Sequence, residues 1–190
     1  MQSGIAGGAG DPSSALSPIT VRSAIPADAA AMAALHVRAW RAVYAGLLPN
    51  AFLAGLTVEE REANWRRSLT APELAPGERI ILVAEASGTV LGLATAGHAR
   101  GDDELGLGEL YALNVDPPAW GQGAGRALLA AATAWLDARF ATSILWVVEG
   151  NLRARSLYER AGWVADGETK VEIYDGTSVN NARYRRAARR

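Results

Sequence analysis

The chain has 190 residues, and its 20 acidic and 19 basic side chains leave a formal net charge of −1. That length suits one domain, which could bury roughly 70% of its unfolded surface without disulfides or metal ions to hold it together. Hydrophobic residues make up 49% and charged residues 21%, a globular composition that excludes wholesale disorder. Without cysteine the chain has no disulfide, no thiolate nucleophile and no cysteine-ligated metal. The near-zero net charge gives no whole-protein attraction to nucleic acid or to an anionic membrane.

The first 18 residues are mostly glycine, alanine, serine and proline. Such a segment cannot bury enough apolar surface to offset its chain entropy, which predicts a flexible N-terminal tail over residues 1–18. It has neither a basic start nor a continuous apolar stretch, and no run in the chain approaches the ~20 apolar residues that span a bilayer. We therefore expect a cytoplasmic protein with one domain over residues 19–187 and a short tail at 188–190.

Hydrophobic periodicity predicts a strand and two helices at the start of the domain. Residues 19–22 alternate like a short strand. Asp28 can cap a helix that runs to about Tyr44, and Thr57 with Glu60 has the spacing of a capping box that opens a second helix. Two prolines between residues 71 and 77 predict a loop.

The rest of the domain alternates strands and helices. Apolar runs at 80–86 and 89–96 are joined by Ser87-Gly88, which predicts a β-hairpin. The remaining expected elements are strands at 107–115 and 143–148, a helix after residue 125, a helix at 151–161, and final strands at 163–173 and 183–185 around an Asp175-Gly176 turn. The order β-α-α-β-β-β-α-β-α-β-β, without an internal repeat, indicates a mixed α/β domain.

The most distinctive segment is Trp120-Gly121-Gln122-Gly123-Ala124-Gly125-Arg126, which joins a predicted strand to a predicted helix. Glycine lets the backbone turn tightly and lets a ligand approach the main chain. The first amides of a helix lack internal partners and carry partial positive charge, so this turn is a natural phosphate site, with the charge of Arg126 nearby. Arg126 stands where a dinucleotide fingerprint needs its last glycine, and no Gly-Lys-Ser/Thr of a P-loop is present. The alternative is a loop that only turns the chain.

Two segments resemble the GNAT acetyltransferase superfamily. The family's phosphate-loop motif, Gln/Arg-x-x-Gly-x-Gly/Ala, is similar to residues 120–125, with Gly123 and Gly125 in place and Trp120 where Gln or Arg is usual. The family's Asn-x-x-Ala-x-x-Leu-Tyr-x-x-x-Gly-Phe segment is similar to residues 151–163, with Trp163 in place of Phe. The resemblance covers residues 19–187 and implies the GNAT α/β fold, a mixed, mostly antiparallel sheet of six to seven strands flanked by about four helices.

The resemblance also implies acetyl-CoA as co-substrate and the groups that bind it. Main-chain groups of Leu113 and Val115 would bond the pantetheine arm and the acetyl carbonyl, where an amide would also stabilise an oxyanion. Asn151 would contact the arm from the other side, unless it serves only as a helix cap. The pyrophosphate would lie on the glycine turn, which comprises Gln122, Gly123, Ala124, Gly125 and Arg126.

Two side chains are candidates for proton transfer. Tyr158 matches the family's usual general acid, which reprotonates the departing thiolate; the alternative is a packing tyrosine. The acceptor amine must lose a proton, and Glu109 lies four residues before Leu113 on the same predicted strand, so both are expected on one face. A carboxylate in a cleft can act as the base directly or through water. The alternative is a surface carboxylate, and Glu149 is a weaker second candidate.

Trp40, Tyr44 and His98 are candidate acceptor contacts. In this family the early helices form a wall of the acceptor pocket, although Trp40 and Tyr44 could equally pack the first helix onto the sheet. His98 ends a predicted strand and could line the same site, but we expect it and His36 to be packed or surface histidines. Two histidines and no cysteine leave too few ligands for a structural metal site, so no metal is expected. Five arginines between residues 183 and 190 indicate either nucleic-acid contact or, as we favour, a solvated face.

The sequence therefore predicts an acetyl-CoA-dependent N-acetyltransferase that works by direct attack, since no cysteine is available as an acyl-enzyme nucleophile. The acceptor would be a primary amine of a small molecule, a peptide N-terminus or a lysine, without nucleic acid or a membrane as partner. A non-catalytic acyl-CoA-binding or sensor module is the alternative, and an amide hydrolase is a second rival. Family analogy alone makes a homodimer plausible.

Overall fold

One mixed sheet forms the framework of the protein. In the part of the chain that the computed structural model describes (residues 18–70, 77–101 and 104–188), seven strands pair in the order β1-β2-β3-β4-β5-β7-β6. Only β4 and β5 run parallel, which confirms the predicted sheet. The strands are β1 Thr20–Ser23, β2 Arg79–Ala86, β3 Thr89–His98, β4 Gly108–Val115, β5 Thr142–Val148, β6 Val164–Tyr174 and β7 Thr177–Ala187. The predicted tail up to residue 17, most of the 71–77 loop and residues 189–190 lie outside the described residues.

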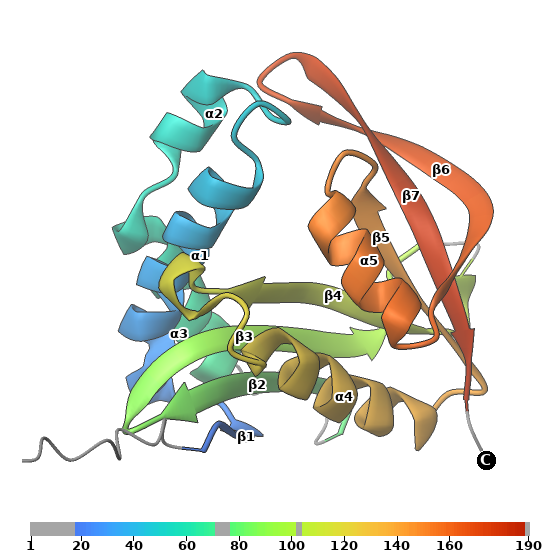
Figure 1. The fold of residues 1–190 in the computed structure, drawn as a ribbon, viewed down its shortest axis with the longest axis horizontal. Coiled ribbons are helices and arrows are strands. Elements are labelled where there is room, and N and C mark those ends of the chain that lie inside the picture. Colours follow the sequence, from blue (N-terminus) through green and yellow to red (C-terminus); the bar gives the residue numbers. More distant parts are fainter. Residues whose placement is uncertain (1–17, 71–76, 102–103, 189–190) are drawn as a thin grey trace, which may run out of the picture.

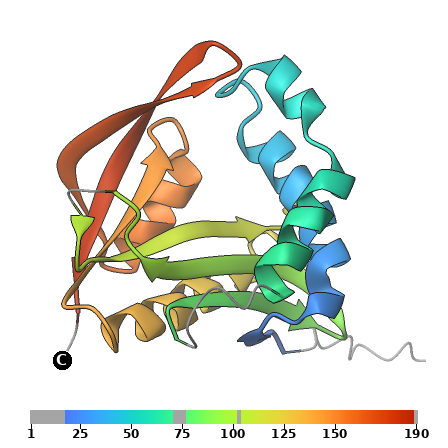
Figure 2. The same cartoon turned by 180° about the vertical axis from the view of Figure 1, so that it is seen from behind.

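Helices cover both faces of this sheet. Leu128 of α4 and Tyr158 of α5 join a core on one face, and Met32 and Leu35 of α1 pack on β2 and β3 on the other. Figures 1 and 2 show these layers from opposite sides. No helix in the described part of the chain is long and apolar enough to cross a bilayer. The sequence did not predict α2, a single short helix that follows Pro49. The described α-helices are α1 Ala29–Val43, α2 Asn50–Gly55, α3 Val58–Thr70, α4 Ala124–Asp137 and α5 Leu152–Arg160.

Two predicted hairpin turns are confirmed by their backbone angles. Ser87 and Gly88 have φ of 49° and 75°, and Asp175 and Gly176 have φ of 47° and 76°. Two successive residues with positive φ make the turn whose twist matches that of the flanking strands. β7 starts earlier than the predicted residue 183, because polar residues from Thr177 onward also pair with β6.

The parallel contact between β4 and β5 is short. Gly108–Leu110 pairs with Ser143–Leu145, and beyond these residues the two strands no longer pair. β5 continues beside β7, and Figure 1 shows β5, β6 and β7 turned away from the first four strands. The divergence leaves one edge of β4 without a strand partner, and this open edge positions the site described below.

β4 also contains a bulge. Leu110 pairs with Ala96 of β3 and Ala112 pairs with Thr95, so Tyr111 is an extra residue without a partner on β3. An extra residue reverses the alternation of faces beyond it. Consequently Leu110 and Leu113 both pack into the core under α4, although their odd spacing would place them on opposite faces of a regular strand.

Candidate active site

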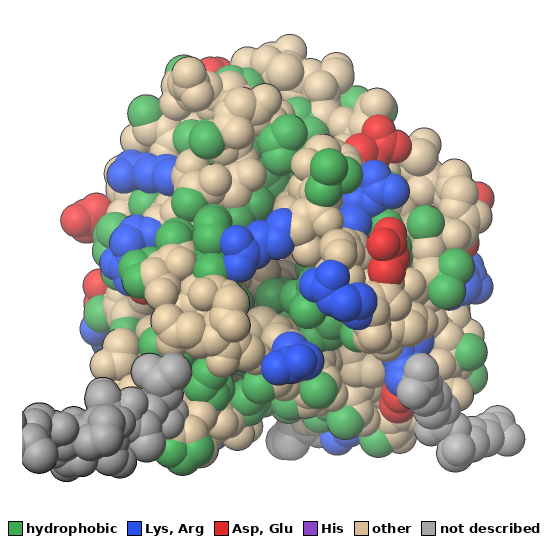
Figure 3. Space-filling view, viewed as in Figure 1, with side chains coloured by type: hydrophobic (Ala, Val, Ile, Leu, Met, Phe, Trp, Pro, Cys, Tyr) green, Lys and Arg blue, Asp and Glu red, His purple; other side chains and the backbone are tan. Residues whose placement is uncertain are grey.

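A cleft of about 320 Å³ opens where β4 and β5 diverge. Its walls come from α1, the free edge of β4, the loop of residues 119–125 and α5, and we call it the glycine-loop cleft. Arg126, Arg153 and Arg160 line it, and no Asp or Glu of the described residues does. Figure 3 shows Lys and Arg side chains around a hollow in the middle of this face. The cleft therefore suits an anionic ligand.

Main-chain groups of β4 point into this cleft. The Asp116 N–H donates to the Leu91 carbonyl of β3 at 2.9 Å. Successive residues of a strand direct their N–H and C=O groups to opposite edges, so Leu113 and Val115 direct theirs away from β3. The Val115 carbonyl accepts the indole N–H of Trp120 at 2.8 Å. The other main-chain groups on this edge have no partner strand and can bond a ligand.

The glycine loop leads directly into α4. Gly121 and Gly123 have φ of 80° and 101°, which favours glycine at both positions. The first intrahelical bond runs from the Ala127 N–H to the Gly123 carbonyl at 3.0 Å. The amides of Ala124, Gly125 and Arg126 precede it and have no side-chain cap, so they remain for a ligand. A Cβ on Gly125 would lie 3.3 Å from the Val115 side chain, so the helix start and β4 approach closely.

Gln122 is the one predicted loop contact that turns outward. Its side-chain amide donates to the Pro118 carbonyl at 3.0 Å, and its N–H donates to the Ala119 carbonyl at 3.4 Å. Gln122 lines a neighbouring groove with Ile19 and Ala86 rather than the glycine-loop cleft. Its hydrogen-bonding groups are therefore used to shape the loop.

Asn151 lies at the start of α5, on the opposite wall. Its side-chain oxygen accepts the Ala154 N–H at 3.2 Å, so it caps the helix. It also lines the cleft together with Tyr44, the residue that follows α1. Burial raises the pKa of Tyr44, an effect that the Asn151 amide opposes and the charge of Glu172 reinforces. The helix-cap role of Asn151 is thus compatible with the predicted ligand contact.

Tyr158 of α5 is buried beside the cleft. It belongs to the core under α4 and α5, and its ring centre lies 6.2 Å from that of Tyr184. Burial raises the pKa of its hydroxyl, and the nearby Tyr44 adds to the shift. Within the described chain this hydroxyl forms no hydrogen bond. Ala154 and Leu157 on the same helix line the cleft. The protonated Tyr158 hydroxyl, which has no hydrogen-bond partner among the described residues, therefore belongs to the helix that forms this wall of the cleft.

Glu109 does not share a face with Leu113. It pairs with Gly97 of β3, directly before Leu110, and the bulge at Tyr111 reverses the alternation between Glu109 and Leu113. The prediction that both side chains face the same side was wrong, because residue spacing along one strand does not reveal a bulge. Glu109 instead lines a second cleft, on the face of the sheet away from α4, which we call the polar cleft.

Ion pairs line the polar cleft. Arg100 holds Glu109 with three hydrogen bonds of 2.6–3.2 Å, two from its guanidinium and one from its main-chain N–H. The Lys170 ammonium contacts Glu172 at 2.9 Å, and the Tyr174 hydroxyl donates to Glu172 at 2.6 Å. Burial raises the pKa of Glu172, but the hydrogen bonds from Lys170 and Tyr174 outweigh it and hold the pKa below its usual range. Among the described residues, no three His, Asp or Glu side chains converge as a metal site.

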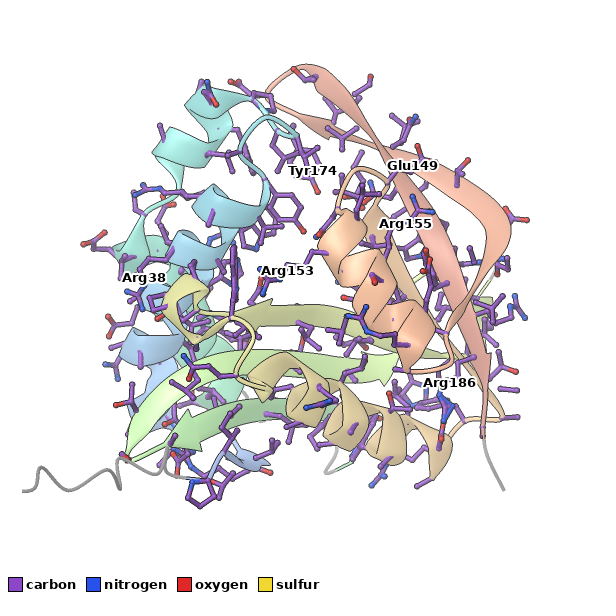
Figure 4. The ribbon with its side chains drawn as sticks, viewed as in Figure 1. Arg38, Glu149, Arg153, Arg155, Tyr174 and Arg186 are labelled. Atoms are coloured by element: carbon purple, nitrogen blue, oxygen red, sulfur yellow. The ribbon has the colours of Figure 1, made fainter. Side chains whose placement is uncertain are left out.

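Trp40 and Tyr44 belong to an aromatic cluster between α1, α2 and the β6–β7 hairpin. The rings of Trp40 and Tyr44 meet edge-on with centres 5.0 Å apart, and Phe52 of α2 meets Tyr174 of β6 at the same distance. Figure 4 labels Tyr174 near the turn between α1 and α2. Tyr44 lines the glycine-loop cleft, whereas Trp40 packs against His36 with ring centres 5.4 Å apart. Of these two predicted acceptor contacts, only Tyr44 reaches the cleft.

Two other candidates lie outside both clefts. His98 pairs with Gly108 and its ring stands edge-on to Phe140, 4.9 Å away, at the end of α4. This places His98 on the face opposite Glu109, where it is an exposed histidine, one of the two outcomes that we expected, and it does not reach the site. Glu149 joins the end of β5 to β7 through its main chain, by donating to the Asn180 carbonyl at 3.0 Å.

The arginines of β7 do not form a free basic face. Arg183 and Arg185 contact Asp166 at 2.9 and 3.2 Å, and Arg186 contacts Asp137 at 3.0 Å. The side chains of Arg183 and Arg186 are only 15% and 8% exposed. The expected solvated face was therefore wrong for these two, and their paired charges do not favour nucleic acid. The last two arginines of the chain lie outside the described residues.

Sequence reasoning missed several residues of the two clefts. Arg153 and Arg160 lie seven residues apart inside the matched 151–163 segment, a spacing that places both on one helix face. That spacing could have identified them. Lys170 and Glu172 reach the polar cleft because the β6–β7 hairpin folds beside β5, which no local pattern reports.

Several known proteins resemble this chain in sequence. The family model described as "Acetyltransferase (GNAT) family" matches residues 40–163. The chain is 36% identical over 135 residues to "Uncharacterized N-acetyltransferase YuaI" of Bacillus subtilis, a match that covers 70% of this chain and 73% of that protein. It is 41% identical over 90 residues to a mycothiol acetyltransferase of Salinispora arenicola, covering 42% of this chain and 29% of that protein.

Solved structures share the fold. The structure of yncA from Salmonella typhimurium, determined with its cofactor acetyl-CoA, has a TM-score of 0.66 at 20% identity and covers 90% of this chain and 94% of that one. PaiA N-acetyltransferase from Thermoplasma acidophilum, in complex with coenzyme A, has a TM-score of 0.64 at 19% identity, with 90% and 99% covered. At these identities the likeness is one of fold.

Proposed function

This chain belongs to the acetyltransferase (GNAT) family, and from that premise we propose that it transfers the acetyl group of acetyl-CoA directly to a primary amine of a small molecule, a peptide N-terminus or a lysine. One observation carries the proposal: a single cleft brings the free main-chain edge of β4 to the start of α4. A strand edge suits the amides of a pantetheine arm, and a helix N-terminus suits a pyrophosphate. The complexes of yncA and PaiA with acetyl-CoA and coenzyme A support this choice of co-substrate.

The residues of the glycine-loop cleft fit the parts of acetyl-CoA in order. We assign the pyrophosphate to the free amides of Ala124, Gly125 and Arg126, with Gly123 giving close access and Gln122 shaping the loop. The pantetheine arm would lie along the main chain of β4 at Leu113 and Val115, with Asn151 on the opposite wall. The acetyl group would then reach the point where β4 and β5 diverge.

The transfer needs a hydrogen-bond donor that stabilises the oxyanion and a proton donor for the leaving thiolate. When the amine attacks the thioester carbonyl, a main-chain N–H of β4 at Leu113 would stabilise the developing oxyanion. As the carbon–sulfur bond breaks, Tyr158 would give its proton to the sulfur. Because burial raises the pKa of Tyr158, the phenol stays protonated at neutral pH, which is the state that a proton donor requires.

The amine must also lose a proton, and the polar cleft supplies a carboxylate for it. We propose that Glu109 accepts this proton directly or through water, while Arg100 fixes the carboxylate in place. The acceptor would approach between β4 and β5, which no longer pair beyond Leu110. Tyr44, at the edge of the glycine-loop cleft, is the proposed acceptor contact.

The experiment is incubation of the protein with acetyl-CoA and separate panels of small amines, peptides with free N-termini and lysine peptides. Free coenzyme A thiol and acetylated amine are measured together, and equal amounts of the two are expected. Binding of acetyl-CoA without product from any amine would instead indicate the non-catalytic acyl-CoA-binding module. Amide cleavage that needs no thioester would indicate the hydrolase.

A homodimer and a cytoplasmic location are further parts of the proposal. β6 is an edge strand, and its Val164, Val171 and Ile173 are 59–66% exposed. An edge strand with exposed apolar side chains can pair with a second copy. Light scattering after size-exclusion chromatography tests the dimer, and fractionation of the host cell tests the location.

A further inference from the structure

Trp120 stands at the first position of the glycine loop, where the family motif has Gln or Arg. Its indole N–H donates to the Val115 carbonyl at 2.8 Å, which fixes the ring against the end of β4. The half-buried ring forms part of the wall of the glycine-loop cleft. The first residue of this loop therefore brings an aromatic face to the cleft, and neither a charge nor a free hydrogen-bond donor.

Arg153 brings a cation to the same place. It is the second residue of α5, and its guanidinium carbon lies 4.0 Å from the centre of the Trp120 ring. Figure 4 shows Arg153 extending from α5 into the space that faces α1. Its neighbour Arg155 donates to the Tyr184 hydroxyl and the Glu149 carbonyl. Arg153, by contrast, has no ion pair or hydrogen bond to any described residue, so its N–H groups are available.

The stacked arrangement prepares the guanidinium for an anion. When a guanidinium contacts an aromatic ring through its planar face, the N–H groups at the edge of the guanidinium remain free. Phosphate oxygens match this planar fork of donors, and a side chain already held in place loses less entropy on binding. The cleft contains two further arginines, Arg126 and Arg160, and no acidic side chain among the described residues. An anion is therefore the partner that this cleft favours.

We propose that Arg153, held over the Trp120 ring, binds a phosphate group of acetyl-CoA, and that Trp120 is a positioning residue for this guanidinium. The inference rests on the proposed function, which identifies the anion as part of acetyl-CoA. The positive charge that pairs with the phosphate then comes from Arg153 of α5, while the glycine loop supplies the ring that orients this guanidinium. The motif's departure at Trp120 and the unpaired Arg153 are explained together.

The test measures dissociation constants by calorimetry for coenzyme A and for pantetheine, which has no phosphate. Arg153→Gln is expected to weaken coenzyme A binding about tenfold, the value of one charge-assisted hydrogen bond, and to leave pantetheine binding unchanged. The matched control is Arg139→Gln. Arg139 also stacks on a tryptophan, with its guanidinium carbon 4.3 Å from the Trp135 ring, but it lies at the end of α4 outside the cleft. This control is expected to bind coenzyme A like the unaltered protein.

The role of Trp120 is tested with two substitutions and a double variant. Trp120→Phe keeps an aromatic face and is expected to retain most of the affinity for coenzyme A, whereas Trp120→Leu is expected to lose as much as Arg153→Gln. The double variant Trp120→Leu/Arg153→Gln should be no weaker than either single variant, because both remove the same interaction. Dephospho-coenzyme A then identifies the phosphate: an unchanged affinity in Arg153→Gln indicates the 3′-phosphate, and a tenfold loss indicates the pyrophosphate.

Two results overturn the inference while the proposed function stands. One is that Arg153→Gln binds coenzyme A as tightly as the unaltered protein. The other is that it weakens pantetheine and coenzyme A equally, which would mean a structural role without phosphate contact. If the unaltered protein binds no coenzyme A at all, both the inference and the proposed function fail.

Discussion

Arg38 of α1 and Asp116 at the end of β4 form a two-point ion pair. The Arg38 Nε and Nη2 donate to the two carboxylate oxygens of Asp116 at 2.9 and 2.5 Å. The Asp116 N–H also donates to Leu91 of β3, so this residue is held from two sides. The glycine loop begins a few residues later. The pair therefore connects the helix that carries Tyr44 to the loop that we assign to the pyrophosphate.

Arg38→Ala should raise the KM for acetyl-CoA several-fold with little loss of stability. The Arg38 side chain is 53% exposed, so the ion pair contributes less than ~1 kcal/mol to the free energy of unfolding. Loss of the ion pair should affect activity more than stability, because a small displacement of the glycine loop misplaces the thioester. Arg66→Ala is the control, since Arg66 pairs with Glu62 on the surface of α3. Equal KM values for the two variants would contradict the connection.

Gly123→Ala should weaken binding of coenzyme A more than its cost in stability explains. Gly123 has φ of 101°, where a residue with a Cβ is strained by about 1–2 kcal/mol, and the strain falls on the first turn of α4. Gly88→Ala introduces a similar strain at φ of 75° in the β2–β3 turn. Urea unfolding and calorimetric titration are measured for both. Equal affinity of the two variants for coenzyme A would contradict the assignment of the pyrophosphate to this loop.

Tyr158→Phe and Tyr184→Phe should have opposite effects. The Tyr158 hydroxyl makes no hydrogen bond to a described residue, so its removal should lower turnover about 100-fold, as loss of a general acid does, with little change in stability. The Tyr184 hydroxyl donates to Glu159 at 2.7 Å and accepts from Arg155 at 2.9 Å. Tyr184→Phe should therefore lower stability by about 1 kcal/mol and retain turnover. Coenzyme A release and urea unfolding are measured for both, and full turnover in Tyr158→Phe removes this residue from the mechanism.

The parts of the site that the sequence predicted are those that lie in continuous segments. The strand, glycine turn and helix around residues 113–126 are local, so spacing and glycine chemistry are enough to identify them. The orientation of Glu109 was not predictable, because the bulge at Tyr111 depends on the pairing with β3. The stack of Arg153 on Trp120 joins two segments about thirty residues apart and appears only once α5 is placed against the loop. The polar cleft likewise requires the β6–β7 hairpin beside β5.

Stability should fall between pH 6.5 and pH 4 because of His36. Burial between α1 and α3 lowers the pKa of His36 from 6.5 to about 4, with a contribution from the charge of Arg61, and neither ring nitrogen has a hydrogen-bond partner among the described residues. The unfolded chain binds the proton more tightly, so acid favours unfolding. The contribution is fully present above pH 6.5 and falls by about 3 kcal/mol as the pH drops to 4.

Urea unfolding at several pH values measures this loss. His36→Phe keeps an aromatic ring between Trp40 and Trp65 and removes the titrating group, so its stability should change much less over the same range. The ion pairs of Asp28 and Asp166 do not obscure the result, because the pKa values of these two carboxyl groups are lowered from 3.8 and their contributions are lost at lower pH. Parallel pH profiles for the two proteins would contradict the assignment to His36.

Thermal unfolding with and without acetyl-CoA tests most directly whether the glycine-loop cleft binds this ligand. At a concentration 100 times its dissociation constant, a ligand that binds only the folded state adds ~2.7 kcal/mol of stability. For a domain of this size the midpoint should rise by roughly 5–10 °C with acetyl-CoA and with coenzyme A. An unchanged midpoint with both at millimolar concentration would mean that the loop only turns the chain, and the proposed activity would be wrong.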